Sequence, residues 1–180
     1  MAVTLNETPS GNRLHIGIFG KTNSGKSSFI NTFSGQKVSI VADVAGTTTD
    51  PVYKPMEIYP LGPCILIDTA GFDDEGELGA LRIEKTSLAA QKTELAIILF
   101  CEDEMVQELK WYNYFKKRQT PVIPVLGKAD LYTQEQKEYL IQMIQKNTGE
   151  TVCPVSSETG EGIRKLKELL AEKIPEGYGN

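Results

Sequence analysis

Eight consecutive residues near the N-terminus carry the strongest chemical signal in this sequence. They are Gly20-Lys21-Thr22-Asn23-Ser24-Gly25-Lys26-Ser27, which match the pattern of two glycines separated by four residues and followed by lysine and serine. In this pattern backbone N–H groups surround phosphate oxygens, and the lysine, here Lys26, reaches the β and γ phosphates. The hydroxyl of Ser27 can then bind Mg²⁺. We therefore predict a nucleoside triphosphate site, to which Asn23, Ser24, Gly25, Lys26, Ser27 and Ser28 contribute.

A carboxylate follows an apolar run in the middle of the chain. Asp68 comes directly after residues 64–67, and Gly71 follows three residues later. On a strand beside a phosphate loop, the carboxylate of Asp68 would face Mg²⁺ through water, and the N–H of Gly71 would contact the γ phosphate. Upstream, Thr47 and Thr48 offer hydroxyls, with Thr48 as a further Mg²⁺ ligand, although a threonine run is also typical of a turn or a strand edge.

A third group of polar residues follows two later apolar runs. Lys128 and Asp130 come after residues 122–126, and Ser156 and Ser157 come after residues 152–155. A carboxylate such as that of Asp130 can accept two N–H donors from the edge of guanine, which adenine does not supply, while the stem of Lys128 covers the ring. The N–H of Ser157 can donate to guanine O6, but this segment reads equally well as a loop with a helix cap. The pattern favours GTP over ATP.

The elements that must position these residues follow from hydrophobic periodicity. Apolar runs typical of buried strands alternate with segments of helical period; the runs are residues 14–19, 64–67, 95–100, 122–126 and 152–155. A further strand at 54–59 would be antiparallel, because only a short connection separates it from the next. We predict an α/β fold with a doubly wound, mostly parallel six-stranded sheet, one antiparallel strand and helices on both faces. Pro124 lies inside a run and predicts a bulge or a lost pairing.

Helical spacing of apolar residues supports four helices. They contain Phe29, Ile30 and Phe33; Met105, Leu109 and Tyr112; Leu140, Met143 and Ile144; and Ile163, Leu166, Leu170 and Ile174. Thr133 with Gln136 predicts a capping box before the third of these helices. We expect a loose tail at 1–13, one domain at 14–174 and a tail or linker at 175–180.

Composition excludes several classes of function. The chain has 180 residues, 24 acidic against 19 basic side chains and a net charge of −5, which argues against a broad basic face for nucleic acid or an anionic membrane. Three scattered cysteines and a single histidine make a structural zinc or cluster site improbable. The apolar runs are shorter than a membrane span requires, so we expect a cytoplasmic protein.

The order of these motifs resembles the translation-factor branch of small P-loop GTPases, in the TrmE and Era group of tRNA-modification and ribosome-assembly GTPases. The resemblance covers residues 14–174. Within that group, segments 46–54, 61–64 and 68–79 are similar to the FeFe-hydrogenase maturation GTPases of the HydF family. Such proteins carry further domains, for dimerisation and for a metal cluster. The resemblance implies the isolated GTPase domain of such a protein, with hydrogenase and radical-SAM maturation proteins as partners of the full-length protein and a homodimer only through the missing domain.

Departures from the family pattern bear on mechanism. Phe72 follows Gly71 where many GTPases have a water-orienting glutamine, and Thr49 stands where related proteins often have arginine, so we expect slow hydrolysis. Asn23 matches the asparagine that binds K⁺ in this group, together with carbonyls of about residues 42–44; a turn residue is the alternative. Gly127 replaces the base-contacting asparagine, so guanine selection depends on Asp130.

Three functions fit these features. The first is a Mg²⁺-dependent, K⁺-stimulated GTPase that acts as a switch in assembling the hydrogenase metal cluster. The second keeps the GTPase and assigns it to tRNA modification or ribosome assembly. The third is a module in which GTP controls docking or dimerisation and hydrolysis is incidental. The acidic residues at 73–77 can form part of a switch or a solvated charge run, and we assign no catalytic base.

Overall fold

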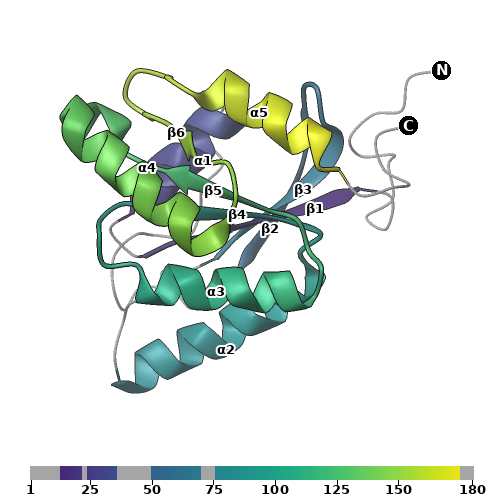
Figure 1. The fold of residues 1–180 in the computed structure, drawn as a ribbon. Coiled ribbons are helices and arrows are strands. Elements are labelled where there is room, and N and C mark those ends of the chain that lie inside the picture. Colours follow the sequence, from purple (N-terminus) through teal and green to yellow (C-terminus); the bar gives the residue numbers. More distant parts are fainter. Residues whose placement is uncertain (1–12, 22–23, 36–49, 70–75, 175–180) are drawn as a thin grey trace.

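The strands of this chain form one six-stranded sheet in the order β2-β3-β1-β4-β5-β6 (Figure 1). The computed structural model describes residues 13–21, 24–35, 50–69 and 76–174, with the backbone alone for 76–83. The strands are β1 (Leu14–Phe19), β2 (Val52–Ile58), β3 (Gly62–Asp68), β4 (Leu95–Phe100), β5 (Val122–Leu126) and β6 (Cys153–Pro154). All neighbours are parallel except β2 and β3. The predicted fold class is confirmed.

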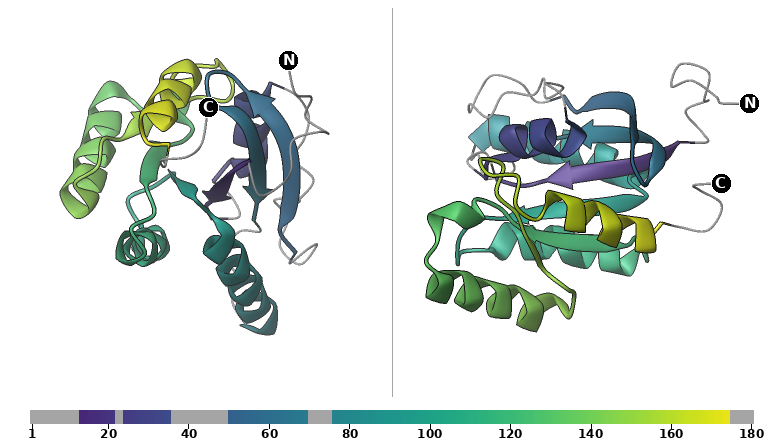
Figure 2. Two further views of the ribbon diagram at one scale, coloured as in Figure 1. Left: turned by 90° about the vertical axis from the view of Figure 1, so that its right-hand side faces the viewer. Right: turned by 90° about the horizontal axis from the view of Figure 1, so that it is seen from above.

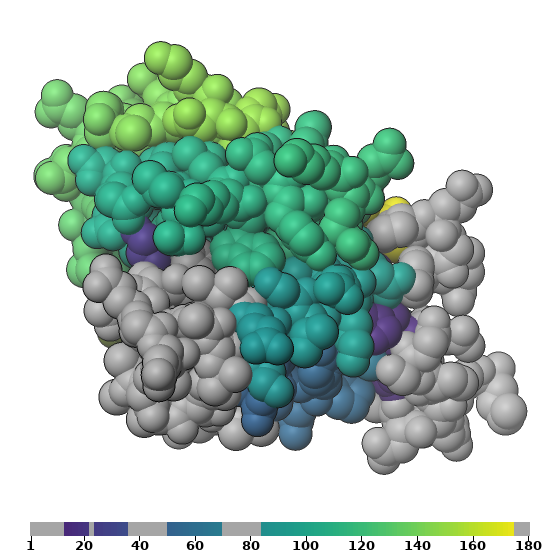
Figure 3. All heavy atoms as spheres, turned by 90° about the horizontal axis from the view of Figure 1, so that it is seen from below, coloured from purple at the N-terminus to yellow at the C-terminus, as the bar shows by residue number. Residues whose placement is uncertain are grey.

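Helices cover both faces of the sheet because its central strands alternate apolar side chains between the two faces. On β4, Leu95, Ile97 and Leu99 belong to one buried cluster, and Ala96 and Ile98 to the other. The helices are α1 (Lys26–Ser34), α2 (Gly76–Lys92), α3 (Val106–Lys117), α4 (Gln134–Thr148) and α5 (Ile163–Glu172). α1 and α5 pack on the first face, and α3 and α4 on the second. Figure 2 shows α1 and α5 above the strands, and Figure 3 looks onto the opposite side, covered by α2 and α3.

The carboxyl ends of the parallel strands point to the same edge of the sheet, which is where the loops of interest begin. β1, β3, β4 and β5 are in register over their full apolar runs, so Ile18 pairs with Asp68 and Phe100 with Leu126. The phosphate loop follows β1, Asp68 ends β3, and the guanine-selecting residues follow β5 and β6. The fold therefore gathers at one edge the residues that the sequence separates by more than a hundred positions.

Pro124 causes no bulge. The register between β4 and β5 continues through the pair Ile98 and Pro124 without a slip. The N–H of Ala96 bonds the carbonyl of Pro121 and the N–H of Gly127 bonds that of Phe100, so Pro124 directs its nitrogen to the other neighbour, β6. β6 pairs with β5 only from Val125 onward. The N–H that proline lacks would therefore lie in the part of β5 that is not yet paired with β6. No bulge forms, and of the two predicted outcomes only the loss of pairing occurs.

Two local differences from the sequence prediction concern α2 and the start of the domain. The sequence prediction contained no helix at 76–92; alternating glycine and charged residues at its start hid the period, and Ala89 and Ala90 supply the small contacts to the sheet. Arg13 was assigned to a loose tail, but its side chain is only 2% exposed. The other four predicted helices and the capping box of α4 are confirmed.

No helix in the described part of the chain is both long and apolar enough to cross a bilayer.

Candidate nucleotide-binding site

The phosphate loop lies between β1 and α1 and is shaped by two glycines. Gly25 caps the start of α1 with φ of 82°, a left-handed conformation that favours glycine. Upstream, the N–H of Ser24 donates to the carbonyl of Lys21 over 3.1 Å. A Cβ on Gly20 would lie 2.7 Å from Ser24 Oγ, so this position needs glycine for the loop to close. The loop therefore presents the N-terminal N–H groups of α1 toward the same edge as Asp68.

Lys26 and Asp68 meet at the base of this loop. The Nζ of Lys26 donates to Asp68 Oδ1 over 2.8 Å, and the Lys26 side chain is fully buried. Thr69, the next residue, donates its hydroxyl to the carbonyl of Ile18 over 2.8 Å and so ties the end of β3 to β1. The structure thus brings together the ammonium and the carboxylate that the sequence assigned to phosphate and to metal. Their charges compensate each other within a buried setting.

The same residues fit Mg²⁺. Ser27 lies in the first turn of α1 and is half-buried, and Asp68 ends the neighbouring strand. The Ser24 hydroxyl is buried and has no hydrogen-bond partner among the described residues, so it is available to an oxygen of a bound anion. Within the described ranges, no group of three or more histidine, cysteine or acidic side chains could hold a metal by itself. One hydroxyl and one carboxylate suit a Mg²⁺ ion that completes its shell with phosphate oxygens and water.

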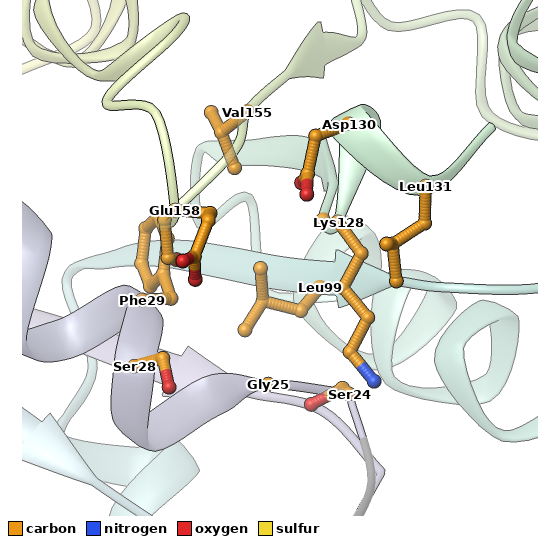
Figure 4. Close-up of a pocket in the computed structure, with 12 residues that line it drawn as sticks. Ser24, Gly25, Ser28, Phe29, Leu99, Lys128, Asp130, Leu131, Val155 and Glu158 are labelled. Atoms are coloured by element: carbon orange, nitrogen blue, oxygen red, sulfur yellow. The ribbon is translucent and has the colours of Figure 1, made fainter.

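A cavity of about 320 Å³ adjoins the phosphate loop (Figure 4). One wall comes from Ser24, Gly25, Ser28 and Phe29, and Leu99 lies at the centre. The rest of the lining comes from residues that follow β5 and β6, namely Gly127, Lys128, Asp130, Leu131, Val155, Ser157 and Glu158. The cavity is apolar in the middle and carries polar groups at its rim. These are the properties of a site for a planar base whose phosphates extend into the loop.

Asp130 directs its carboxylate into this cavity and is held in place by a neighbouring loop. Its Oδ1 accepts a hydrogen bond of 2.8 Å from the hydroxyl of Ser156, which is fully buried. Lys128 has φ of 58°, and Figure 4 shows its side chain extended toward Gly25. The Lys128 stem passes so close that a Cβ on Gly25 would lie 3.2 Å from its Cε. The lysine stem therefore covers one side of the cavity, as the sequence predicts.

The loop after β6 is anchored at both ends. The carbonyl of Ser157 accepts a hydrogen bond of 3.2 Å from Thr32 on α1, and the N–H of Ser156 donates to the carbonyl of Glu161 over 3.0 Å. A Cβ on Gly162 would lie 2.0 Å from the carbonyl oxygen of Pro154, so the return of the chain requires glycine there. This loop thus fixes the rim of the cavity near Asp130.

Several predicted site residues lie outside the described residues. They are Asn23, Thr47, Thr48 and Gly71, together with Thr49, Phe72 and the carbonyls of residues 42–44. Their roles in binding Mg²⁺, K⁺ and the γ phosphate remain predictions. Conversely, the sequence prediction did not include Phe29, Leu99, Leu131 and Glu158 as cavity residues. Leu99 occupies a strand position that reads as core, and no local signal distinguishes it from its neighbours.

A family model described as "50S ribosome-binding GTPase" matches residues 15–128 of this chain. This match spans more than half of the sequence and includes the phosphate loop, Asp68 and Lys128. The chain belongs to this GTPase family. It is a GTP-binding, GTP-hydrolysing P-loop domain.

This GTPase domain matches part of several longer proteins. It is 33% identical to GTPase Der from Wolinella succinogenes, over 98% of this chain and 38% of that protein. It is also 33% identical to the tRNA modification GTPase MnmE from Endomicrobium trichonymphae, over 93% of this chain and 38% of that protein. The GTPase domain thus spans about two fifths of the length of these relatives.

Solved structures of Era share the fold of this GTPase domain. Aquifex aeolicus Era bound to GDP and AlF₄⁻ superposes with a TM-score of 0.76 and 27% identity, covering 90% of this chain and 57% of Era. Era in complex with MgGDPNP and nucleotides 1506–1542 of 16S ribosomal RNA gives a TM-score of 0.77 at 27% identity, over 92% of this chain and 58% of that one. The expectation of no nucleic-acid partner, drawn from the acidic charge, does not fit this relative.

Proposed function

We propose that this chain is the switch domain of a larger GTPase that serves tRNA modification or ribosome assembly. The observation that carries the nucleotide part is the cavity that joins the phosphate loop to Asp130. The tRNA-modification and ribosome-assembly part is supported by the relatives, which are named Der, MnmE and Era. None of these names concerns a hydrogenase, so the hydrogenase interpretation rests on the sequence resemblance alone.

In the proposed mechanism, the described residues bind and orient the nucleotide. Lys26 would exchange its contact with Asp68 for the β and γ phosphates, and the N–H groups at the start of α1 would surround the same oxygens. Ser27, Thr48 and Asp68 would hold Mg²⁺, which when bound neutralises phosphate charge. Gly71 would report the γ phosphate to the segment that follows it. Hydrolysis is slow in this proposal because Phe72 cannot orient the attacking water.

Guanine selection is tested at Asp130. Asp130→Asn replaces one acceptor oxygen by a donor, which disfavours guanine and favours the 2-oxo base of xanthosine triphosphate. We expect GTP affinity to fall and xanthosine triphosphate affinity to rise in equilibrium binding with Mg²⁺. Asp103→Asn, at an exposed aspartate outside the cavity, is the control and should change neither affinity. An unchanged base preference in Asp130→Asn would overturn this assignment.

The K⁺ site is proposed at Asn23. A monovalent cation between the phosphates would supply the positive charge that an arginine supplies in other GTPases. Single-turnover GTP hydrolysis should be faster in KCl than in NaCl at equal ionic strength, and Asn23→Ala should remove this difference. Equal rates of the wild-type domain in both salts would contradict the proposal.

The cellular role is tested with the full-length protein. If it serves the ribosome, ribosomal subunits should retain it in sedimentation with the non-hydrolysable analogue GMPPNP and release it with GDP. A downstream region with cysteine and histidine cluster ligands, and no retention by subunits or tRNA, would instead support hydrogenase maturation. The third candidate, a GTP-controlled docking module in which hydrolysis is incidental, predicts tight GTP binding with slow single-turnover hydrolysis at the same rate in either salt.

A further inference from the structure

Lys21, the second residue of the phosphate loop, is buried although it carries a charge. Its side chain is 6% exposed, and the ammonium contacts only groups that follow β4 among the described residues. Its Nζ donates to Glu102 Oε1 over 2.7 Å, to Glu104 Oε2 over 2.8 Å and to the carbonyl of Glu104 over 2.6 Å. Glu108 Oε2 lies 3.4 Å away. The three N–H donors of the ammonium are therefore all used by the segment that follows β4.

The carboxylates around Lys21 lie in the connection between β4 and α3 and in the first turn of α3. Glu104 uses its second oxygen, Oε1, to accept the N–H of Val106 over 3.0 Å, at the first residue of the helix. Glu108 lies one turn further on and is fully buried. Although burial lowers the pKa of Lys21, its hydrogen bonds to Glu102 and Glu104 hold that pKa above the ordinary value, so the ammonium stays charged. The contact is a charged, desolvated link between the phosphate loop and α3.

α3 also holds the loop on the other side of Gly20. Phe19, the residue before it, stacks on Trp111 with ring centroids 5.8 Å apart and meets Phe115 at 5.0 Å. The chain is thus fixed by an apolar contact at Phe19 and by ion pairs at Lys21. Between these two anchors lies the glycine that permits no Cβ.

We propose that Lys21 is a positioning residue that presets the phosphate loop for the β and γ phosphates. Its main chain and its side chain act together. The carbonyl of Lys21 accepts the N–H of Ser24, which closes the loop, and the clamped ammonium prevents that carbonyl from turning away. A loop that is already closed loses less conformational entropy when phosphate binds. The inference rests on the nucleotide site proposed above and extends it to α3.

The base pocket provides an internal control for this role. Lys21 does not line the cavity that contains Gly127, Lys128 and Asp130. Loss of the contacts between Lys21 and the glutamates should therefore weaken the binding of the phosphates and spare the binding of the base. A role confined to holding the fold together would weaken both, because an unfolded fraction lowers every affinity by the same factor.

The test compares GDP with guanosine as competitors of a fluorescent GDP analogue. For Lys21→Met, we expect the dissociation constant of GDP to rise about 10- to 100-fold, the effect of losing a charged hydrogen-bonded contact. That of guanosine should change less than about twofold. Lys21→Arg should restore GDP affinity to within about threefold of the wild type, because a guanidinium can also bridge the carboxylates. Lys173→Met, which removes an ion pair of 3.6 Å with Glu150, is the matched control and should change neither constant.

A second variant keeps the proposal testable if Lys21→Met does not fold. Glu104→Gln lies outside the loop and weakens one of the contacts, so it should produce a smaller loss for GDP with the same sparing of guanosine. Equal losses for GDP and guanosine, or no loss in either variant, would overturn the proposal. If guanosine fails to compete even in the wild type while GDP competes, the base assignment fails, and the positioning role is then judged by whether Lys21→Met weakens GDP binding at an unchanged melting temperature.

Discussion

Gly127 stands where the family pattern has a base-contacting asparagine, so it bears on the strength of guanine binding. It follows β5, donates its N–H to the carbonyl of Phe100 over 2.9 Å and lines the cavity with backbone alone. A Cβ at this position would lie 3.5 Å from the carbonyl oxygen of Ser24, an ordinary van der Waals distance. The site therefore accepts a Cβ at this position without a clash.

Gly127→Asn should tighten GTP binding. The new carboxamide would lie near the Ser24 carbonyl and would link the loop after β5 to the phosphate loop by a hydrogen bond. One added bond predicts about 2- to 10-fold higher affinity, measured by titration calorimetry. Gly127→Ala supplies the Cβ without the carboxamide and should leave the affinity unchanged. An equal gain in both variants would mean that backbone stiffening, not the amide, is responsible.

Glu108 predicts a pH dependence of folding. Burial raises the pKa of its carboxyl from 4.5 to about 7. The folded state thus binds the proton more tightly than the unfolded state, so the free energy of unfolding falls as pH rises between these two values. Glu108→Gln removes the titration, and its stability relative to the wild type should be greater near pH 8 than near pH 4 by up to about 3 kcal/mol.

Urea unfolding of the Glu108→Gln variant at several pH values provides the measurement. Glu135→Gln, an exposed glutamate in the first turn of α4, is the control and should show no comparable pH-dependent gain. A constant difference between Glu108→Gln and the wild type across the pH range would refute this account of the buried carboxyl.

At the scale of elements, local sequence signals set where helices begin, and packing sets which of them form. α4 begins at a capping box in which Thr133 Oγ1 accepts the N–H of Gln136 over 3.1 Å and Gln136 Oε1 accepts the N–H of Thr133 over 2.9 Å. This box is readable from two residues at a fixed spacing. The sequence prediction finds no such signal for α2, whose buried apolar contacts, among the side chains that the structure describes, are made by Ala90 with β4 and Ala89 with β3.

Thr133→Ala should lower the free energy of unfolding by about 1 kcal/mol, because one N–H at the start of α4 loses its partner. The affinity for GDP should not change, since Thr133 lies outside the cavity. Thr133→Ser keeps the hydroxyl and should retain most of the stability in a urea titration. If serine destabilises as much as alanine, the methyl group and not the cap is what matters.

For the molecule as a whole, a bound nucleotide should stabilise the fold by connecting the loops at one edge of the sheet. The phosphate loop, Asp68 and the loops after β5 and β6 belong to different parts of the chain, and a bound nucleotide would contact all of them. Ligand that binds only the folded state raises stability by mass action. The effect reports the nucleotide preference of the intact domain without a label.

GDP with Mg²⁺ at about 100 times its dissociation constant should stabilise the domain by about 2.7 kcal/mol. For a chain of this size the melting temperature should then rise by roughly 5 to 10 °C in scanning calorimetry. ADP at the same concentration serves as the control and should produce little shift. A similar rise with both nucleotides would argue against guanine selection at Asp130.

The sequence by itself determined the strands, four of the five helices and the nucleotide motifs. These follow from local rules: apolar runs, helical spacing, a glycine-lysine loop and a carboxylate after a strand. The same rules assign Lys26, Asp68, Lys128 and Asp130 to the site. They also predicted a bulge or a lost pairing at Pro124 without deciding between the two, because the direction of its nitrogen depends on strand order.

Only the tertiary structure decided how distant residues meet. Lys21 reads as an unremarkable loop lysine, yet it is held by carboxylates 81 and 83 positions away. Leu99 reads as core, yet it lines the cavity. Such contacts arise from the packing of α3 against the end of β1 and from the order of strands in the sheet. The partners in these contacts lie far apart in the sequence. No short stretch of sequence therefore contains both residues, and the distance between them and their burial exist only in the folded protein.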